Sequence, residues 1–197
     1  TTDCIRHSIW WVNKDLDNGL SAALEPLDKV YLADGHHRLA SSLKLMHRYA
    51  DEPGVDRMLA YVIPAKELRI LGFHREVLNW KGDLREFIAR IESIESVDSV
   101  VKLEGEAARV EPPMGCIDCI HANSVYRITL SSNSGANRID AQWLSEEIIE
   151  RLIAISNPRN NPNLKYIPGT ITRDDLIEKT SGGLNIVFGL HPIPIEL

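Results

Sequence analysis

Residues 31–38 constrain this chain more than any other stretch. They read Tyr-Leu-Ala-Asp-Gly-His-His-Arg, so an apolar run ends in Asp34-Gly35 and two histidines and an arginine follow at once. The apolar run is too short for a helix and is typical of a buried strand. Glycine can adopt the backbone angles of a sharp turn. Beyond it, apolar residues recur at helical spacing (Leu39, Leu43, Met46 and Ala50). The pattern predicts a strand, a tight turn and a helix N-terminus.

A helix N-terminus at this turn predicts an anion site. The first helical turn leaves backbone N–H groups unpaired and carries partial positive charge, so a phosphate or carboxylate binds well there. Arg38 can hold a phosphate with two hydrogen bonds, and His36 and His37 can donate to its oxygens or move a proton. Asp34 has three open roles: helix cap, magnesium ligand or acceptor of a hydroxyl proton. We expect Gly35 and the three basic residues to bind phosphate, with Asp34, His36 and His37 catalytic.

A second His-Arg pair, His74-Arg75, follows an apolar stretch at residues 68–73. Open α/β sheets bind ligands beside strand ends. We therefore expect His74 and Arg75 to contribute to phosphate or nucleotide binding. The alternative is a surface salt bridge from Arg75.

Metal binding is a further hypothesis. Cys116, Cys119 and His121 have the spacing of a zinc knuckle or a redox pair. A structural zinc needs four ligands, however, and no second cysteine pair exists, so the alternative is cysteines without a site on an irregular segment. His36 and His37 are adjacent and diverge by about 100° on a helix, which disfavours zinc there.

Composition and missing motifs exclude several classes of function. The 197 residues carry a net charge of -6, which does not favour nucleic-acid binding. No apolar stretch approaches the roughly 20 residues of a membrane span, and the odd number of cysteines indicates a reducing cytoplasm. Motifs of P-loop kinases and dinucleotide enzymes are absent. We expect a cytoplasmic protein with a small-molecule substrate; homo-oligomerisation stays open.

Alternating strand and helix patterns predict an α/β or α+β fold, with a mixed sheet and flanking helices. The strands are expected at residues 4–12, 30–33, 58–63, 68–73, 97–103, 125–130 and 184–190. Helices are expected at residues 15–27 and 36–50 and after the capping residues Asp83, Asp140 and Thr172. The loop-like residues 105–114 predict two lobes, 1–104 and 115–197.

Several segments together resemble a bacterial and archaeal family known as domain of unknown function 1015. Residues 31–38 are similar to its Y-I-A-D-G-H-H-R signature, residues 7–10 to its H-x-L-W strand and residues 73–75 to its T-H-R element. Residues 139–155 and 157–166 resemble later elements in the same order. Members of the family usually carry a long N-terminal portion before the H-x-L-W strand. If that portion contributes to the site, the resemblance implies that this chain holds only part of it.

The D-G-H-H-R run is also similar to the G-H-R-R box of ParB-like and sulfiredoxin-like folds, in which a strand, a turn and a helix hold nucleotide phosphates. Free-serine kinases of that superfamily carry a D-G-H-H-R run. This second resemblance implies a ParB/sulfiredoxin-like core and phosphoryl transfer to a small hydroxyl compound such as free L-serine. The implied donors are ATP, ADP or pyrophosphate, with Mg²⁺. Two alternatives stay open: a ParB-like nucleotide-binding regulatory protein without phosphotransferase activity, and a non-catalytic fragment.

Overall fold

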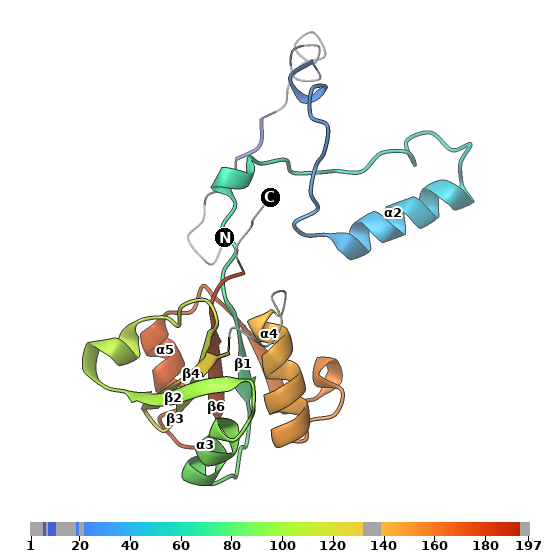
Figure 1. Cartoon of the computed structure of the whole chain (residues 1–197). Helices are drawn as coiled ribbons and strands as arrows, with labels where there is room; N and C mark the ends of the chain where they lie inside the picture. The colour runs from blue at the N-terminus through green and yellow to red at the C-terminus, as the bar shows by residue number, and fades with distance from the viewer. Residues whose placement is uncertain (1–5, 7, 11–18, 20–21, 132–138, 194–197) are drawn as a thin grey trace. The chain divides into compact units, whose positions relative to one another are not determined.

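A computed structural model describes residues 6, 8–10, 19, 22–131 and 139–193 of the chain (Figure 1). Contacts between Cα atoms divide the chain into two compact units, Thr1–Val62 (unit 1) and Ile63–Leu197 (unit 2). The division therefore falls near residue 62 and not in the 105–114 segment, where the sequence placed a boundary. The strands on either side of that segment belong to one sheet, which explains the difference.

Unit 1 contains the helix that the sequence predicts, α2 (His36–Arg48). The strands predicted at residues 30–33 and 58–63 are wrong for this structure, because both stretches have no assigned strand. A strand needs a hydrogen-bonded neighbour, and the described residues of unit 1 supply none. No described residue of unit 1 is buried. The strand predicted at residues 4–12 lies mostly outside the described residues. Of the helix predicted at residues 15–27, residues 19 and 22–27 are described, and residues 19 and 22–24 are helical.

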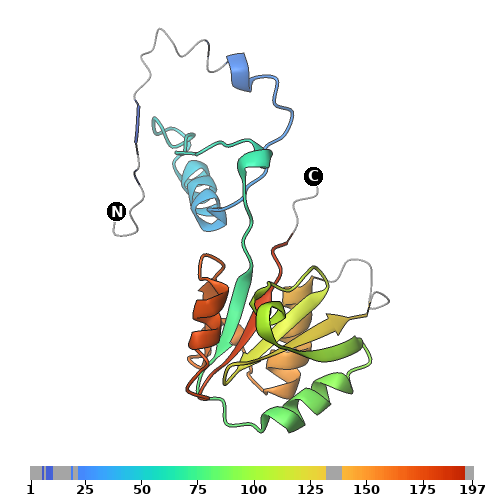
Figure 2. The same ribbon diagram turned by 90° about the vertical axis from the view of Figure 1, so that its left-hand side faces the viewer.

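Unit 2 is built on a six-stranded sheet with the order β2-β4-β3-β6-β1-β5. Every pairing between its strands is antiparallel, so the class is α+β (Figure 2). The strands are β1 (Phe73–Val77), β2 (Val97–Leu103), β3 (Cys116–His121), β4 (Ser124–Leu130), β5 (Leu164–Pro168) and β6 (Ile186–Leu190). The strands predicted near β2, β4 and β6 are confirmed. The stretch predicted at residues 68–73 becomes strand only from Phe73.

Helices cover both faces of this sheet, with α4 and α5 on opposite sides in Figure 1. Face A, which carries Cys119 and Phe188, packs against α3 (Leu84–Glu92), α4 (Asp140–Trp143) and its π-helical continuation η3 (Leu144–Leu152). Face B, which carries Ile120 and Val187, packs against α5 (Arg173–Glu178) through Leu176. The short 3₁₀ turns are η1 (Ala65–Glu67), η2 (Gly105–Arg109) and η4 (Pro158–Asn160).

Two of the three predicted helix caps are confirmed. The Asp83 carboxylate accepts a hydrogen bond from Glu86 N at 2.9 Å, and the Thr172 hydroxyl accepts one from Asp175 N at 3.2 Å. Asp140 is not a cap, because Ile139 holds the N-cap position of α4. The Asp140 carboxylate instead accepts from Gly115 N at 3.1 Å, which ties the helix to the residue preceding β3. Burial of this carboxyl group raises its pKa.

Candidate functional site

The turn into α2 has the geometry of an open helix N-terminus. Gly35 is the N-cap residue, with φ 86° and ψ 23°, and no side chain among the described residues caps the helix. The capping role considered for Asp34 is therefore wrong. The first hydrogen bond of the helix runs from Leu39 N to Gly35 O at 2.9 Å. The N–H groups of the preceding turn thus have no intrahelical acceptor, and no acidic side chain in that turn opposes the positive end of the helix dipole.

Arg38 folds back over this turn. A Cβ atom built on Gly35 would lie 3.0 Å from Arg38 Nη2 and 3.1 Å from Nε. Glycine is thus favoured here for two reasons. The backbone is left-handed, and the guanidinium leaves little room for a Cβ atom. Arg38 Nη2 also lies 3.6 Å from Asp34 Oδ2, but 77% and 94% of the two side chains are exposed. An ion pair this exposed is weak, so the guanidinium remains available to a ligand.

His36 and His37 complete the set at the start of α2, and both are exposed. Backbone N–H groups, a guanidinium, a carboxylate and two imidazoles therefore come together within residues 34–38. The arrangement suits an anion, because three kinds of donor occur in the first turn of one helix.

The second predicted pair, His74-Arg75, belongs to unit 2 and does not act as a pair. His74 lies on face B and is buried, with Nδ1 accepting from Leu190 N at 3.1 Å. Burial lowers the pKa of His74, although Glu111 opposes this shift. Arg75 lies on face A, where its guanidinium covers the ring of Tyr166. The surface salt bridge considered as the alternative for Arg75 is not found among the described residues.

Neither the zinc or redox hypothesis for Cys116 and Cys119 nor the irregular segment of its alternative fits the structure, because residues 116–121 form the central strand β3. Cys116 and Cys119 lie on opposite faces of β3, since side chains alternate along a strand. Cys116 Sγ contacts Thr129 Oγ1 at 3.8 Å, and His121 Nδ1 contacts Asn185 O at 2.8 Å. Within the described ranges, no three His, Cys, Asp or Glu side chains form a group that could hold a metal ion.

Comparison with known proteins places the chain in a family. The sequence model of the family described as "Protein of unknown function (DUF1015)" matches residues 1–152. The chain belongs to the DUF1015 family. The match covers α2 and strands β1 to β4, and β5, α5 and β6 follow it. No curated protein and no solved structure matches the chain. The likeness to ParB/sulfiredoxin-like kinases stays a prediction.

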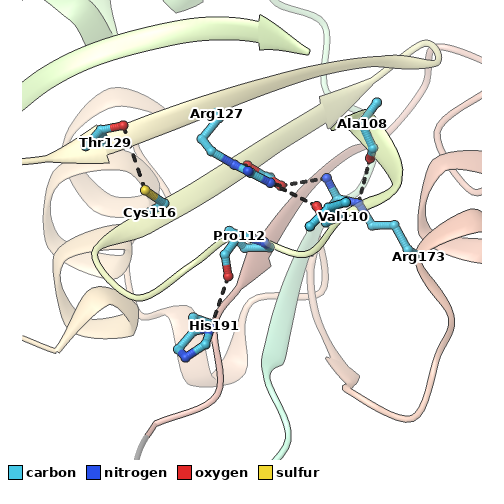
Figure 3. A network of polar contacts seen from close by, with 9 residues as sticks. Ala108, Val110, Pro112, Cys116, Arg127, Thr129, Arg173 and His191 are labelled. Atoms are coloured by element: carbon cyan, nitrogen blue, oxygen red, sulfur yellow. Dashed lines mark hydrogen bonds and ion pairs between the residues drawn. The ribbon is translucent and has the colours of Figure 1, made fainter. Parts of the chain in front are cut away.

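Sequence reasoning missed the buried charge network of this DUF1015 chain (Figure 3). The fully buried Asp118 carboxylate accepts from Arg127 Nε and Nη2, both at 2.9 Å, and from Arg173 Nη2 at 2.6 Å. The arginines also donate to the main-chain oxygens of Val110 and Ala108. The network thus joins β3, β4 and α5 to the segment between β2 and β3.

A signal for half of this network was present in the sequence. If residues 116–121 and 124–130 are taken as a hairpin, Asp118 faces Arg127, as the observed register confirms. Opposite charges directly across a strand pair attract. Arg173 gave no such signal, because it meets Asp118 across 55 residues of sequence.

In the part of the chain that the structure describes, no helix is long and apolar enough to cross a membrane.

Proposed function

We propose that this DUF1015 chain transfers a phosphoryl group to a small hydroxyl compound and that the N-terminus of α2 holds the phosphates of the donor. Free L-serine is the acceptor to test first, with ATP, ADP or pyrophosphate as donor. One observation carries the proposal: no side chain caps α2, and the Arg38 guanidinium lies over its N-cap glycine. The donors of this turn therefore face outward and lack an internal acceptor.

Phosphoryl transfer suits such a site because it depends on positioning and charge neutralisation more than on covalent chemistry. The unpaired N–H groups and the helix dipole stabilise negative charge on the donor oxygens. Arg38 adds a planar guanidinium that can hold two of these oxygens at once. The exposed His36 and His37 can donate further hydrogen bonds as charge moves to the leaving group.

Asp34 is the proton acceptor of the reaction. The acceptor oxygen forms a bond to phosphorus, the bond from phosphorus to the leaving oxygen breaks, and Asp34 takes the hydroxyl proton. Asp34 is also the carboxylate that would hold a Mg²⁺ ion, which supplies further neutralisation of the donor phosphates. His74 has no part in this scheme, because it is buried and accepts a hydrogen bond from Leu190.

The test is to incubate the chain with L-serine, MgCl₂ and each donor, and to detect O-phosphoserine by mass spectrometry. We expect product, and we expect Arg38→Gln to remove most of it. Arg57→Gln is the matched control, since Arg57 is similarly exposed (85%) and lies 3.8 Å from Asp56. Absence of product with every donor would overturn the phosphotransferase proposal. Saturable ATP binding without product would instead favour the regulatory nucleotide-binding alternative.

A further inference from the structure

A second cluster in unit 2 has unused binding capacity: Phe73, Arg75 and Tyr166 on face A. Arg75 on β1 lies directly across from Tyr166 on β5, and Phe73 precedes Arg75 on the same face. The two rings lie 5.8 Å apart between centroids and are nearly parallel, with an interplanar angle of 28°. The Arg75 guanidinium lies 4.3 Å from the Tyr166 centroid and 5.6 Å from that of Phe73. Two stacked rings and a guanidinium therefore lie together on face A.

The charge of Arg75 is not neutralised by any described residue of unit 2. No carboxylate pairs with it among the described residues, and its buried Nε has no hydrogen-bond partner. Its Nη1 donates only to the main-chain oxygens of Phe73 and His74. Arg127 and Arg173 differ, because both bind Asp118. A guanidinium partly withdrawn from water without a counter-ion is costly, and an external anion would relieve that cost.

The rings beside it are open to solvent, which a purely structural cluster does not require. Phe73 is 50% exposed and Tyr166 is 37% exposed. Further along the same two strands and the same face, Val77 and Leu164 are 3% and 6% exposed. Within unit 2, the helices therefore cover one end of this strand pair and do not cover the aromatic end. Aromatic side chains exposed on a sheet are stacking surfaces for nucleic-acid bases.

We propose that Phe73, Arg75 and Tyr166 bind a nucleotide, with the base stacked on the aromatic rings and a phosphate paired with the guanidinium. The same three side chains supply both stacking and anion pairing, so a ligand that is both planar and anionic should bind them most tightly. The site accepts any of the nucleic-acid bases, because every base has a π-face that can stack. It lies wholly in unit 2 and is independent of the phosphate site proposed at α2.

The experiment is a titration of the ¹⁵N-labelled full chain with AMP, adenosine and inorganic phosphate, followed by NMR. We expect AMP to shift amides of β1 and β5 and to bind at least about tenfold more tightly than either part alone. Arg75→Gln and Tyr166→Leu should each weaken AMP about tenfold or more. Arg75→Lys should bind with intermediate affinity, because the charge remains while the planar fork is lost.

Two substitutions serve as controls, Arg85→Gln on the exposed surface of α3 and Tyr61→Leu in unit 1, where Tyr61 is 90% exposed. Both should leave the affinity for AMP unchanged. Unaltered spectra of β2 and β4 in each variant show that the sheet has folded. The proposal is overturned if AMP moves no amide of β1 or β5, or if phosphate alone binds as tightly as AMP. Shifts confined to residues 34–38 would also overturn it, while leaving the phosphate site at α2 intact.

Discussion

Arg173 Nη2 and Asp118 Oδ2 lie 2.6 Å apart, and both side chains are almost wholly removed from water. Arg127, on β4, binds the same carboxylate, with Nε 2.9 Å from Oδ1. One buried anion is thus shared by two cations on different elements. Removing a single partner of a buried ion pair leaves an uncompensated charge, which is more costly than the loss of the attraction alone. The stability of unit 2 should therefore depend on Asp118.

Asp118→Asn should lower the free energy of unfolding by about 3–5 kcal/mol, because it leaves the buried Arg173 guanidinium and the partly buried Arg127 guanidinium without an anion. The measurement is urea denaturation followed by circular dichroism. Asp174→Asn is the control: Asp174 lies 3.7 Å from Arg109, and both side chains are more than half exposed. The control should change the stability by less than about 1 kcal/mol. Equal losses in the two variants would contradict the importance of the buried network.

Gly35→Ala should weaken phosphate binding at α2 more than the backbone strain alone can explain. The substitution forces an L side chain into a left-handed backbone and brings its Cβ to 3.0 Å from Arg38 Nη2. Gly54→Ala is the matched control, since Gly54 has a φ of +84° and open space around the added Cβ. Both variants carry backbone strain of about 1–2 kcal/mol, but only Gly35→Ala displaces the guanidinium. Calorimetric titration with pyrophosphate should show weaker binding in Gly35→Ala than in Gly54→Ala.

Local chemistry explains which features could be predicted from the sequence. The caps formed by Asp83 and Thr172 use hydrogen bonds that span three residues. The residues that make the sequence motif therefore also make the contact, and the motif alone predicts it. The turn at Gly35 is equally local. The sequence therefore predicts α2, α3 and α5, and it predicts strands β2, β4 and β6 of the six in unit 2.

Features that depend on sheet pairing could not be predicted in this way. His74 and Arg75 are neighbours in sequence, yet they lie on opposite faces of β1, because successive side chains of a strand alternate. The apolar residues 58–63 have the composition of a buried strand, but Leu59 is 99% exposed and Tyr61 is 90% exposed. Composition gives the tendency to form a strand, whereas pairing decides whether one forms.

Cys116 and Cys119 should resist alkylation in the folded protein. Burial, reinforced by the Asp118 carboxylate, raises the pKa of the Cys119 thiol far above its ordinary value, so little of the reactive thiolate forms. Cys116 is 7% exposed. The measurement is treatment with iodoacetamide at pH 8, with mass spectrometry of the peptide that carries both residues. Labelling should require urea, and rapid modification of Cys119 without denaturant would contradict the buried strand.

The stability of unit 2 should fall as the pH drops below the ordinary pKa of histidine, because of His74. Burial lowers the pKa of His74 in the folded state, so the unfolded chain binds a proton first as the pH decreases. Stability is therefore full above the unfolded pKa of about 6.5. It is lost progressively between that pH and the lower folded pKa, with a slope of at most about 1.4 kcal/mol per pH unit.

His74→Gln keeps a side chain that can accept from Leu190 N but does not titrate. The free energies of unfolding measured by urea denaturation at pH 7.5 and pH 5.5 should therefore differ less in this variant than in the wild type. His47→Gln, at an exposed position of α2, should keep the wild-type difference. If His74→Gln keeps that difference as well, another group is responsible for the pH dependence.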